Sequence, residues 1–169
     1  MTVTMKWISR LLLLAVLGAV AWWLWRVLNP SDELRIKRIL VQIADTVSVP
    51  AEGKFVGGVL AADRLKGFFI PEAEIAVDVP GEARFNLTGR EELQQAYLMA
   101  RSRYRGLKVE FFDIQVAVAP DHNSAVADLT ARARQSTGDL HVQEMRVNFL
   151  RRDDEWRVQR VETTRSIKF

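Results

Sequence analysis

Hydrophobic residues recur with helical spacing in three segments of the chain. The clearest pattern lies within residues 29–50, where five apolar positions follow a period of about 3.6 residues: Ile36, Ile39, Leu40, Ile43 and Val47. A second helix is predicted within 51–69 and a third within 88–106. Gly57 and Gly58 weaken the second helix and indicate a close-packing or bend point. They do not resemble a phosphate-binding loop, because no Lys-Ser or Lys-Thr pair follows them.

Strand patterns replace the helical period in the last third of the chain. Four long strands joined by short turns are predicted as an antiparallel meander at residues 107–119, 125–135, 140–152 and 156–169. Residues 73–88 read as two short strands around the turn Pro80-Gly81. The sequence therefore predicts an α+β fold, in which a curved antiparallel sheet of four long strands plus a short hairpin wraps around three helices.

The alternation in the second and third long strands constrains the turn between them. The apolar face of 125–135, centred on Leu129, occupies odd positions, and so does the apolar face of 140–152, which includes Val147. A two-residue hairpin would place these two sets on opposite faces of the sheet. We therefore predict a three-residue loop or a bulge within 136–139.

The first long strand is apolar on both faces. Strict alternation places Val109 and Phe111 on one face, and it places four further residues on the other: Phe112, Ile114, Val116 and Val118. Helices are predicted to cover one face. The other face is then predicted to meet another subunit or to remain as an exposed patch.

The N-terminal segment has the pattern of a membrane anchor. Residues 11–25 form an unbroken apolar run, and extension to 7–28 gives a segment long enough, at roughly 33 Å, to cross a bilayer core. Tryptophans and arginines mark its two ends, as is typical of membrane interfaces: Trp7, Arg10, Trp22, Trp23, Trp25 and Arg26. We predict a tail at 1–6, a transmembrane helix at 7–28, a linker at 29–31 and a folded domain at 32–169.

Two features leave the processing and orientation of this segment open. The residues Ala19-Val20-Ala21 match the small-x-small pattern of signal-peptidase sites, and cleavage there is the alternative to a permanent anchor. Basic residues lie on both sides of the apolar run. The short tail and signal-like start favour export. We therefore expect a single-pass protein of the cell membrane, with the C-terminal domain outside the cytoplasm.

Charge and composition exclude several classes of function. The chain has no cysteine, so disulfides, thiolate metal sites and cysteine nucleophiles are excluded. The net charge of +3 resides entirely in residues 1–29, and the remaining 21 basic side chains balance 21 acidic ones. A neutral domain does not provide the basic face that nucleic acids require, so we expect no nucleic-acid partner.

The order of elements, with the helix entry "LTGREELQQAY" after the hairpin, resembles the nuclear-transport-factor-2-like superfamily over residues 31–169. That superfamily includes ketosteroid isomerase and the SnoaL-like polyketide cyclases. The resemblance implies a sheet curved into a cone with a pocket. It also implies functions that range from enzymes to pure protein-binding modules.

The resemblance directs attention to acids, tyrosines and histidines. Isomerases of this fold use a carboxylate base and a tyrosine from the first helix, but here the two tyrosines, Tyr97 and Tyr104, fall on the third helix at core spacing. Dehydratase and cyclase relatives use His–Asp pairs, whereas His122 lies in a turn and His141 stands alone on a strand. Four carboxylates are candidates for an inward base: Asp63, Asp78, Asp113 and Asp128. No pair among them has a defined spacing, so we assign no catalytic residue, metal site or cofactor.

Two groups of basic residues have competing interpretations. Alternating arginines on facing strands, with Glu144 nearby, favour cross-strand ion pairs over a docking patch for an acidic partner: Arg132, Arg134 and Arg146. A second group at the end of the third helix offsets the helix dipole, or touches an anionic membrane surface: Arg101, Arg103, Arg105 and Lys108.

These observations favour a membrane-tethered, nonenzymatic domain that mediates protein association in an envelope assembly. Its expected partners are the membrane and either a second copy, bound through the outer face of the sheet, or another protein. The alternatives are a domain that binds a small apolar ligand in the cone pocket and, with less support, an isomerase- or cyclase-like enzyme.

Overall fold

The computed structural model describes residues 16, 18, 31–50, 55–78, 85–104 and 106–167. The chain divides into two compact units, Met1–Ser31 and Asp32–Phe169. The predicted transmembrane helix at 7–28, with all six of its anchor residues, lies outside the described residues apart from positions 16 and 18. In the part of the chain that is described, no helix combines the length and the apolar character that crossing a bilayer requires.

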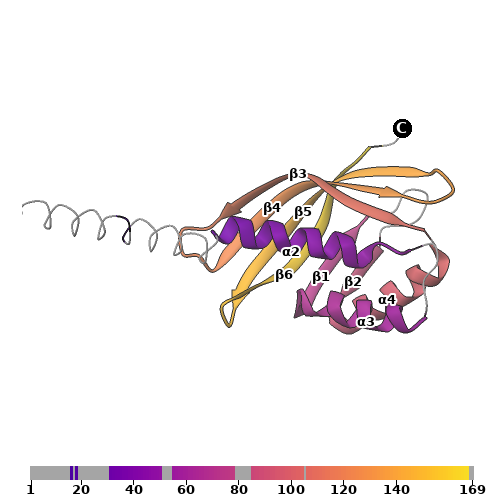
Figure 1. Cartoon of the computed structure of the whole chain (residues 1–169), viewed down its shortest axis with the longest axis horizontal. Helices are drawn as coiled ribbons and strands as arrows, with labels where there is room; N and C mark the ends of the chain where they lie inside the picture. The colour runs from indigo at the N-terminus through magenta and orange to yellow at the C-terminus, as the bar shows by residue number, and fades with distance from the viewer. Residues whose placement is uncertain are drawn as a thin grey trace, which may run out of the picture. The chain divides into compact units, whose positions relative to one another are not determined.

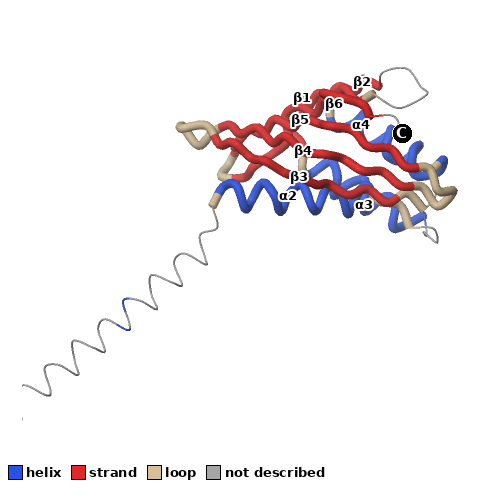
Figure 2. The backbone as a smooth tube through the Cα atoms, turned by 90° about the horizontal axis from the view of Figure 1, so that it is seen from above, coloured by secondary structure: helices blue, strands red, loops and turns tan. Residues whose placement is uncertain are grey.

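Within its described residues, the second unit contains three helices and six strands (Figure 1). The helices are α2 (Asp32–Val47), α3 (Phe55–Gly67) and α4 (Arg90–Arg103). The strands are β1 (Phe69–Val77), β2 (Phe85–Thr88), β3 (Lys108–Val118), β4 (Ser124–Arg134), β5 (Leu140–Arg152) and β6 (Glu155–Ile167). All three predicted helices of the domain are present, and the segments predicted as four long strands and a separate short hairpin form one six-stranded sheet. Seen from above in Figure 2, α2 and α3 lie on one side of the curved sheet.

The sheet differs from the predicted one in how the hairpin joins it. The strand order is β2-β1-β6-β5-β4-β3, so the hairpin strands extend the sheet formed by the four long strands. β1 pairs with β6 in parallel, whereas the other neighbours are antiparallel. The expectation of a purely antiparallel sheet was therefore wrong: the sheet is mixed and six-stranded. A parallel pair needs a long connection, and α4 with the four strands β2 to β5 supplies it here.

The turn between β4 and β5 confirms the parity argument. Leu129 lies opposite Met145, and Ala127 lies opposite Val147, so both apolar sets face the core. The backbone N–H of Gln135 donates to the carbonyl of Asp139 at 3.0 Å, which leaves three residues in the loop. Gly138, with φ of 100°, takes the left-handed position that such three-residue loops require.

A β-bulge in β3 overturns the prediction of a two-sided apolar strand. The register with β4 shifts by one residue between Phe112 and Gln115, and Asp113 adopts a φ of 52°. The shift returns the strand's apolar residues on either side of the bulge to the core face: Phe111, Ile114, Val116 and Val118. Only Phe112 of the predicted second face remains outside, with 37% of its surface exposed.

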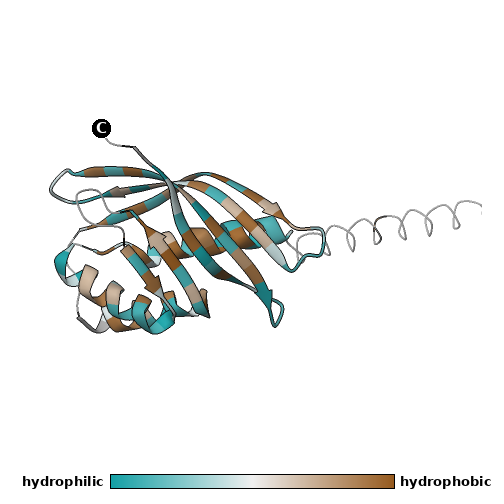
Figure 3. Ribbon diagram, turned by 180° about the vertical axis from the view of Figure 1, so that it is seen from behind, coloured by the Kyte–Doolittle hydropathy of each residue, from teal (hydrophilic) through white to brown (hydrophobic). Residues whose placement is uncertain are grey.

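The core lies between α2 and the concave face of the sheet. Its largest fully buried side chains come from α2, α3, β5 and β6: Ile36, Leu40, Leu65, Phe149 and Val158. Figure 3 shows hydrophobic and hydrophilic positions alternating along the long strands, as expected for a sheet with one buried and one solvated face.

Candidate functional site

The interior of the cone holds a small apolar cavity of about 140 Å³. Every helix and all strands except β2 contribute to its thirteen lining side chains, and all thirteen are apolar. α2 supplies Leu40, Ile43 and Val47, and the opposite wall includes Met145 and Val147 of β5. The cavity therefore has an apolar interior, and it is smaller than the roughly 300 Å³ at which most ligand pockets begin.

The four candidate carboxylates are not brought together in this cavity. Asp63 is exposed on α3 and accepts a hydrogen bond of 2.9 Å from Gln94 of α4. Asp113 is exposed at the bulge of β3, and Asp128 is exposed on β4. At the end of β1, the backbone N–H of Asp78 donates to the Thr163 hydroxyl at 3.1 Å.

Tyr97 packs in the core, as its helical spacing predicted, whereas Tyr104 is only partly buried. The side chain of Tyr97 is buried, and its hydroxyl donates a hydrogen bond of 2.9 Å to the carbonyl of Thr46 in α2. Tyr104 is half-buried, with the guanidinium of Arg103 5.8 Å from the centre of its ring. The Tyr97 hydroxyl thus joins α4 to α2 and is occupied by the protein itself.

The two histidines lie in different places. His141 is exposed on β5. His122 is exposed in the turn between β3 and β4, but its Nδ1 lies 3.0 Å from a carboxylate oxygen of Asp32. The other carboxylate oxygen accepts a hydrogen bond of 3.1 Å from Nε1 of Trp156, and Arg151 forms an ion pair with it at 3.8 Å.

This Asp32 cluster ties the start of α2 to two hairpin ends of the sheet. Partial burial raises the pKa of Asp32, but the hydrogen bonds from Trp156 and His122 and the positive charge of Arg151 outweigh it, so the pKa lies below its ordinary value of 3.8. The sequence offered no signal for this cluster, because its members come from segments far apart in the chain.

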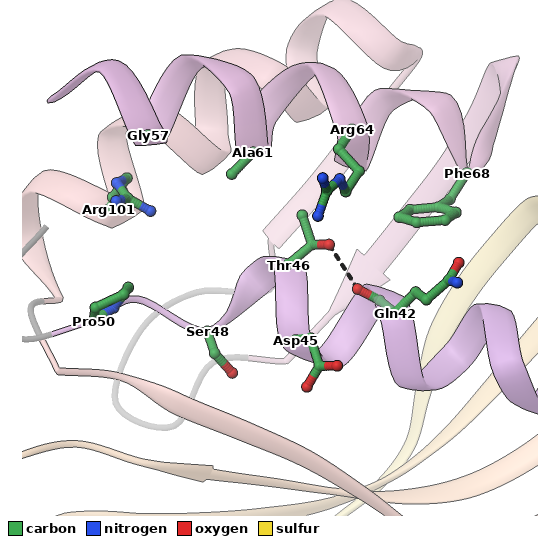
Figure 4. Close-up of a pocket in the computed structure, with 10 residues that line it drawn as sticks. All are labelled: Gln42, Asp45, Thr46, Ser48, Pro50, Gly57, Ala61, Arg64, Phe68 and Arg101. Carbon is green, nitrogen blue, oxygen red and sulfur yellow. Dashed lines mark hydrogen bonds between the residues drawn. The ribbon is translucent and has the colours of Figure 1, made fainter. Parts of the chain in front are cut away.

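A large concave surface runs between α2 and α3. Two adjoining hollows, of about 740 and 480 Å³, share Gln42, Arg64 and Phe68. We call this surface the α2–α3 groove. Figure 4 shows Arg64 of α3, and Phe68 of the turn that follows it, projecting toward α2, with Arg101 of α4 at the other end. The groove is open to solvent and lies outside the cone cavity.

Arginines are the dominant charges of the groove. Arg35 and Arg38 line it from α2, and Arg64 lines it from α3. Within the described residues, no carboxylate forms an ion pair with any of these three side chains. Arg101 instead donates to the Tyr97 hydroxyl at 3.2 Å, and Arg157 pairs with Glu155 at 2.6 Å.

Solved structures share this architecture. A nuclear-transport-factor-2-like protein with a cystatin-like fold from Novosphingobium aromaticivorans has a TM-score of 0.59 and 18% identity, over 87% of this chain and 86% of that one. A nuclear-transport-factor-2-like protein of unknown function from Pseudomonas putida has a TM-score of 0.63 and 12% identity, over 80% and 87%. The chain has the nuclear-transport-factor-2-like fold.

A further structure with this fold carries an enzyme's name. It is called "Putative Scytalone Dehydratase", comes from Novosphingobium aromaticivorans, and has a TM-score of 0.55 and 16% identity, over 80% of this chain and 85% of that one. No protein-family model matches this sequence, and neither does any curated protein. At such identities the likeness concerns the nuclear-transport-factor-2-like fold, and function has to be argued from the sites.

On the outer face of this nuclear-transport-factor-2-like sheet, the predicted cross-strand ion pair is present for Arg146. Its guanidinium contacts both carboxylate oxygens of Asp128 across the strands, at 2.8 and 3.4 Å. Arg132 instead stacks over the ring of Phe112 at 4.4 Å. Arg134 is exposed at the end of β4. The outer face therefore carries charges of both signs, and two of its arginines interact with neighbouring side chains of the sheet.

The basic group near the end of α4 is also largely engaged within the nuclear-transport-factor-2-like domain. Arg101 packs against Gly58 of α3, and Arg103 lies over Tyr104. Lys108 forms an ion pair with Glu110 at 2.6 Å. Arg105 lies outside the described residues. These contacts explain three of the four basic residues without a membrane surface.

Proposed function

We propose that this protein is a membrane-tethered, nonenzymatic domain that mediates protein–protein association in an envelope assembly. One observation carries the proposal. The chain's own apolar side chains reduce the cone interior to about 140 Å³, while large apolar side chains stand more than half exposed on all three helices. These exposed side chains are Leu34 and Val41 on α2, Leu60 on α3 and Met99 on α4. Association through the outside of the domain would give them a partner.

Cysteine cross-linking tests association directly, because the chain contains no cysteine of its own. Single variants Leu60→Cys and Met99→Cys report on the helices, and Val126→Cys reports on the outer sheet face, where a second copy is the expected partner. Thr137→Cys, at an exposed position in the turn between β4 and β5 and outside the α2–α3 groove, is the control. A specific covalent adduct at the helices or the sheet, with none at Thr137→Cys, is expected. Adducts at no position, or equally at all positions, would refute association.

The tether is the second part of the proposal. It is supported by the apolar segment 7–28 and by the aromatic and basic residues at its ends. We expect the full chain to resist alkaline extraction from membranes, and we expect protease added outside intact cells to reach the domain. The mass of the mature N-terminus decides between anchor and signal peptide. A chain that starts at Trp22 would show that the segment is removed.

A second candidate function is the binding of a small apolar ligand within the cone. The specific observation that favours it is the entirely apolar lining of the cavity. An apolar cavity of about 150 Å³ is large enough to bind benzene or xenon. The ligand would therefore have to be of that size unless the cone opens, and a thermal-shift assay with benzene tests it.

A further inference from the structure

We propose that the α2–α3 groove binds an acidic, amphipathic segment of a partner protein in an extended conformation. The inference rests on the proposed association function and assigns the surface and the chemistry of the partner. Three observations support it: arginines along the groove that have no carboxylate partner within the described residues, apolar side chains within it, and its length and concave shape.

The arginines provide the charge that an acidic segment needs. Arg38 and Arg64 are exposed on opposite sides of the groove, and Arg35 is half-buried beside them. None has a carboxylate partner among the residues that the structure describes. A guanidinium binds a carboxylate through two parallel hydrogen bonds, which fixes orientation as well as charge.

The acids that line the groove are distributed unevenly. Glu155 is paired with Arg157 at 2.6 Å, and Asp154 with Arg151 at 3.3 Å. Asp45 is exposed further along α2, toward the end that contains Arg101. The acidic side chains of a bound segment would therefore lie over Arg38 and Arg64 rather than beside Asp45.

Apolar side chains lie between the charges. Ile39 and Phe68 are half-buried in the groove, and the indole of the buried Trp156 lines its end. On α3, Gly57 and Ala61 precede Arg64 at helical spacing and line the same side of the groove. Because their side chains are absent or small, they leave space for a bound segment. Apolar residues of a bound segment would cover these side chains while its carboxylates reach the arginines.

Length and shape favour a polypeptide over a membrane surface. From Arg35 to Ser48 the groove follows α2 for roughly 20 Å, at about 1.5 Å per residue. An extended segment of about six residues has that length, at about 3.3 Å per residue. A bilayer surface is flat and would rest on the helix crests, leaving the concave floor with Phe68 uncovered.

The test uses the full chain in nanodiscs of zwitterionic lipid and a fluorescent eight-residue peptide of alternating Glu and Leu. Peptides with Gln or Lys in place of Glu are the probe controls. We expect the Glu peptide to bind and the two control peptides to bind much more weakly. Arg38→Glu and Arg64→Glu should each weaken binding about tenfold, and salt should weaken it further. Arg134→Glu, which alters an exposed arginine outside the groove, should bind like the wild type.

Three results would overturn the inference: no binding of the Glu peptide, equal binding of the Gln peptide, or equal losses in Arg64→Glu and Arg134→Glu. Loss of binding in nanodiscs of anionic lipid would show that the groove faces the bilayer and would also overturn it. Thermal melts establish that each variant is folded. If cysteine cross-linking succeeds while the peptide fails, association stands and the groove assignment falls. If cross-linking fails as well, both fall.

Discussion

The indole nitrogen of Trp156 donates a hydrogen bond of 3.1 Å to Asp32, across 124 positions of sequence. Trp156 is 4% exposed, so its N–H has little access to water and depends on this acceptor. The contact joins the first turn of α2 to the start of β6. It therefore holds the N-terminal end of α2 in place, directly after the last residue of the N-terminal unit, Ser31.

We predict that Asp32→Asn lowers the free energy of unfolding at pH 7 by about 1–2 kcal/mol, because hydrogen bonds to a charged acceptor are replaced by weaker ones. The folded-state pKa of Asp32 is depressed. Its stabilisation is therefore complete above the unfolded pKa and is lost as pH falls through the folded pKa. Denaturant titrations at pH 7 and under acid conditions should show a smaller acid loss in the variant. Asp45→Asn, at an exposed position on the same helix and outside the Asp32 cluster, is the control, and an identical acid loss in both variants would contradict this role.

The bulge at Asp113 gives a prediction about backbone conformation. At a φ of 52°, glycine is unstrained and a β-branched residue is strongly disfavoured. We expect Asp113→Gly to leave stability nearly unchanged and Asp113→Val to lower it by about 1–2 kcal/mol. Denaturant midpoints measure both. A Val variant as stable as the Gly variant would mean that the left-handed conformation is not required there.

This bulge also shows where reading the sequence fails. Alternation predicted the existence and position of β3, and parity predicted the loop around Gly138, because both follow from a strict two-residue period. The bulge breaks that period by one residue. Nothing in the local sequence distinguishes Asp113 from an ordinary outward-facing strand residue, so an apparent second apolar face was inferred where most of those residues reach the core.

The candidate sites were less accessible to sequence reasoning than the fold. Arg38 and Arg64 face each other only because α2 packs beside α3, and Asp32 meets His122 and Trp156 only because two hairpins end at the same place. Such contacts depend on tertiary packing, and no periodic pattern in the sequence indicates them. The pairing of β1 with β6 was missed for the same reason.

Substitution by alanine should change the stability of the protein differently at the two adjacent glycines of α3. A Cβ on Gly57 would meet only the tip of Arg101 at 4.0 Å, whereas one on Gly58 would lie 2.9 Å from its Nε and 3.0 Å from its Cδ. We expect Gly57→Ala to stabilise the protein by about 0.5–1 kcal/mol through helix propensity. Gly58→Ala should give no gain, because it displaces Arg101 from Tyr97.

A double-mutant cycle with Arg101→Ala separates these effects. In that background the obstacle to a Cβ at Gly58 is removed, so Gly58→Ala should now stabilise by about as much as Gly57→Ala. Thermal or chemical unfolding of the four variants of the cycle gives the coupling energy. A coupling near zero would mean that Gly58 is not required for the contact between α3 and α4.

The cavity in the cone predicts different outcomes at two neighbouring buried positions. Val147 lines the cavity, whereas Ala127, opposite it on β4, is fully buried away from the lining. Val147→Ile adds a methylene where space exists and should leave stability unchanged or raise it by up to about 0.8 kcal/mol. Ala127→Val adds atoms to a packed site and should cost about 1–3 kcal/mol. Benzene should raise the melting temperature of the wild type by binding only the folded state, and it should do so less for Val147→Ile. The prediction fails if the two substitutions destabilise the protein equally and benzene changes the melting temperature of neither the wild type nor Val147→Ile. That result would mean that the side chains close the cavity completely and that the cone binds nothing.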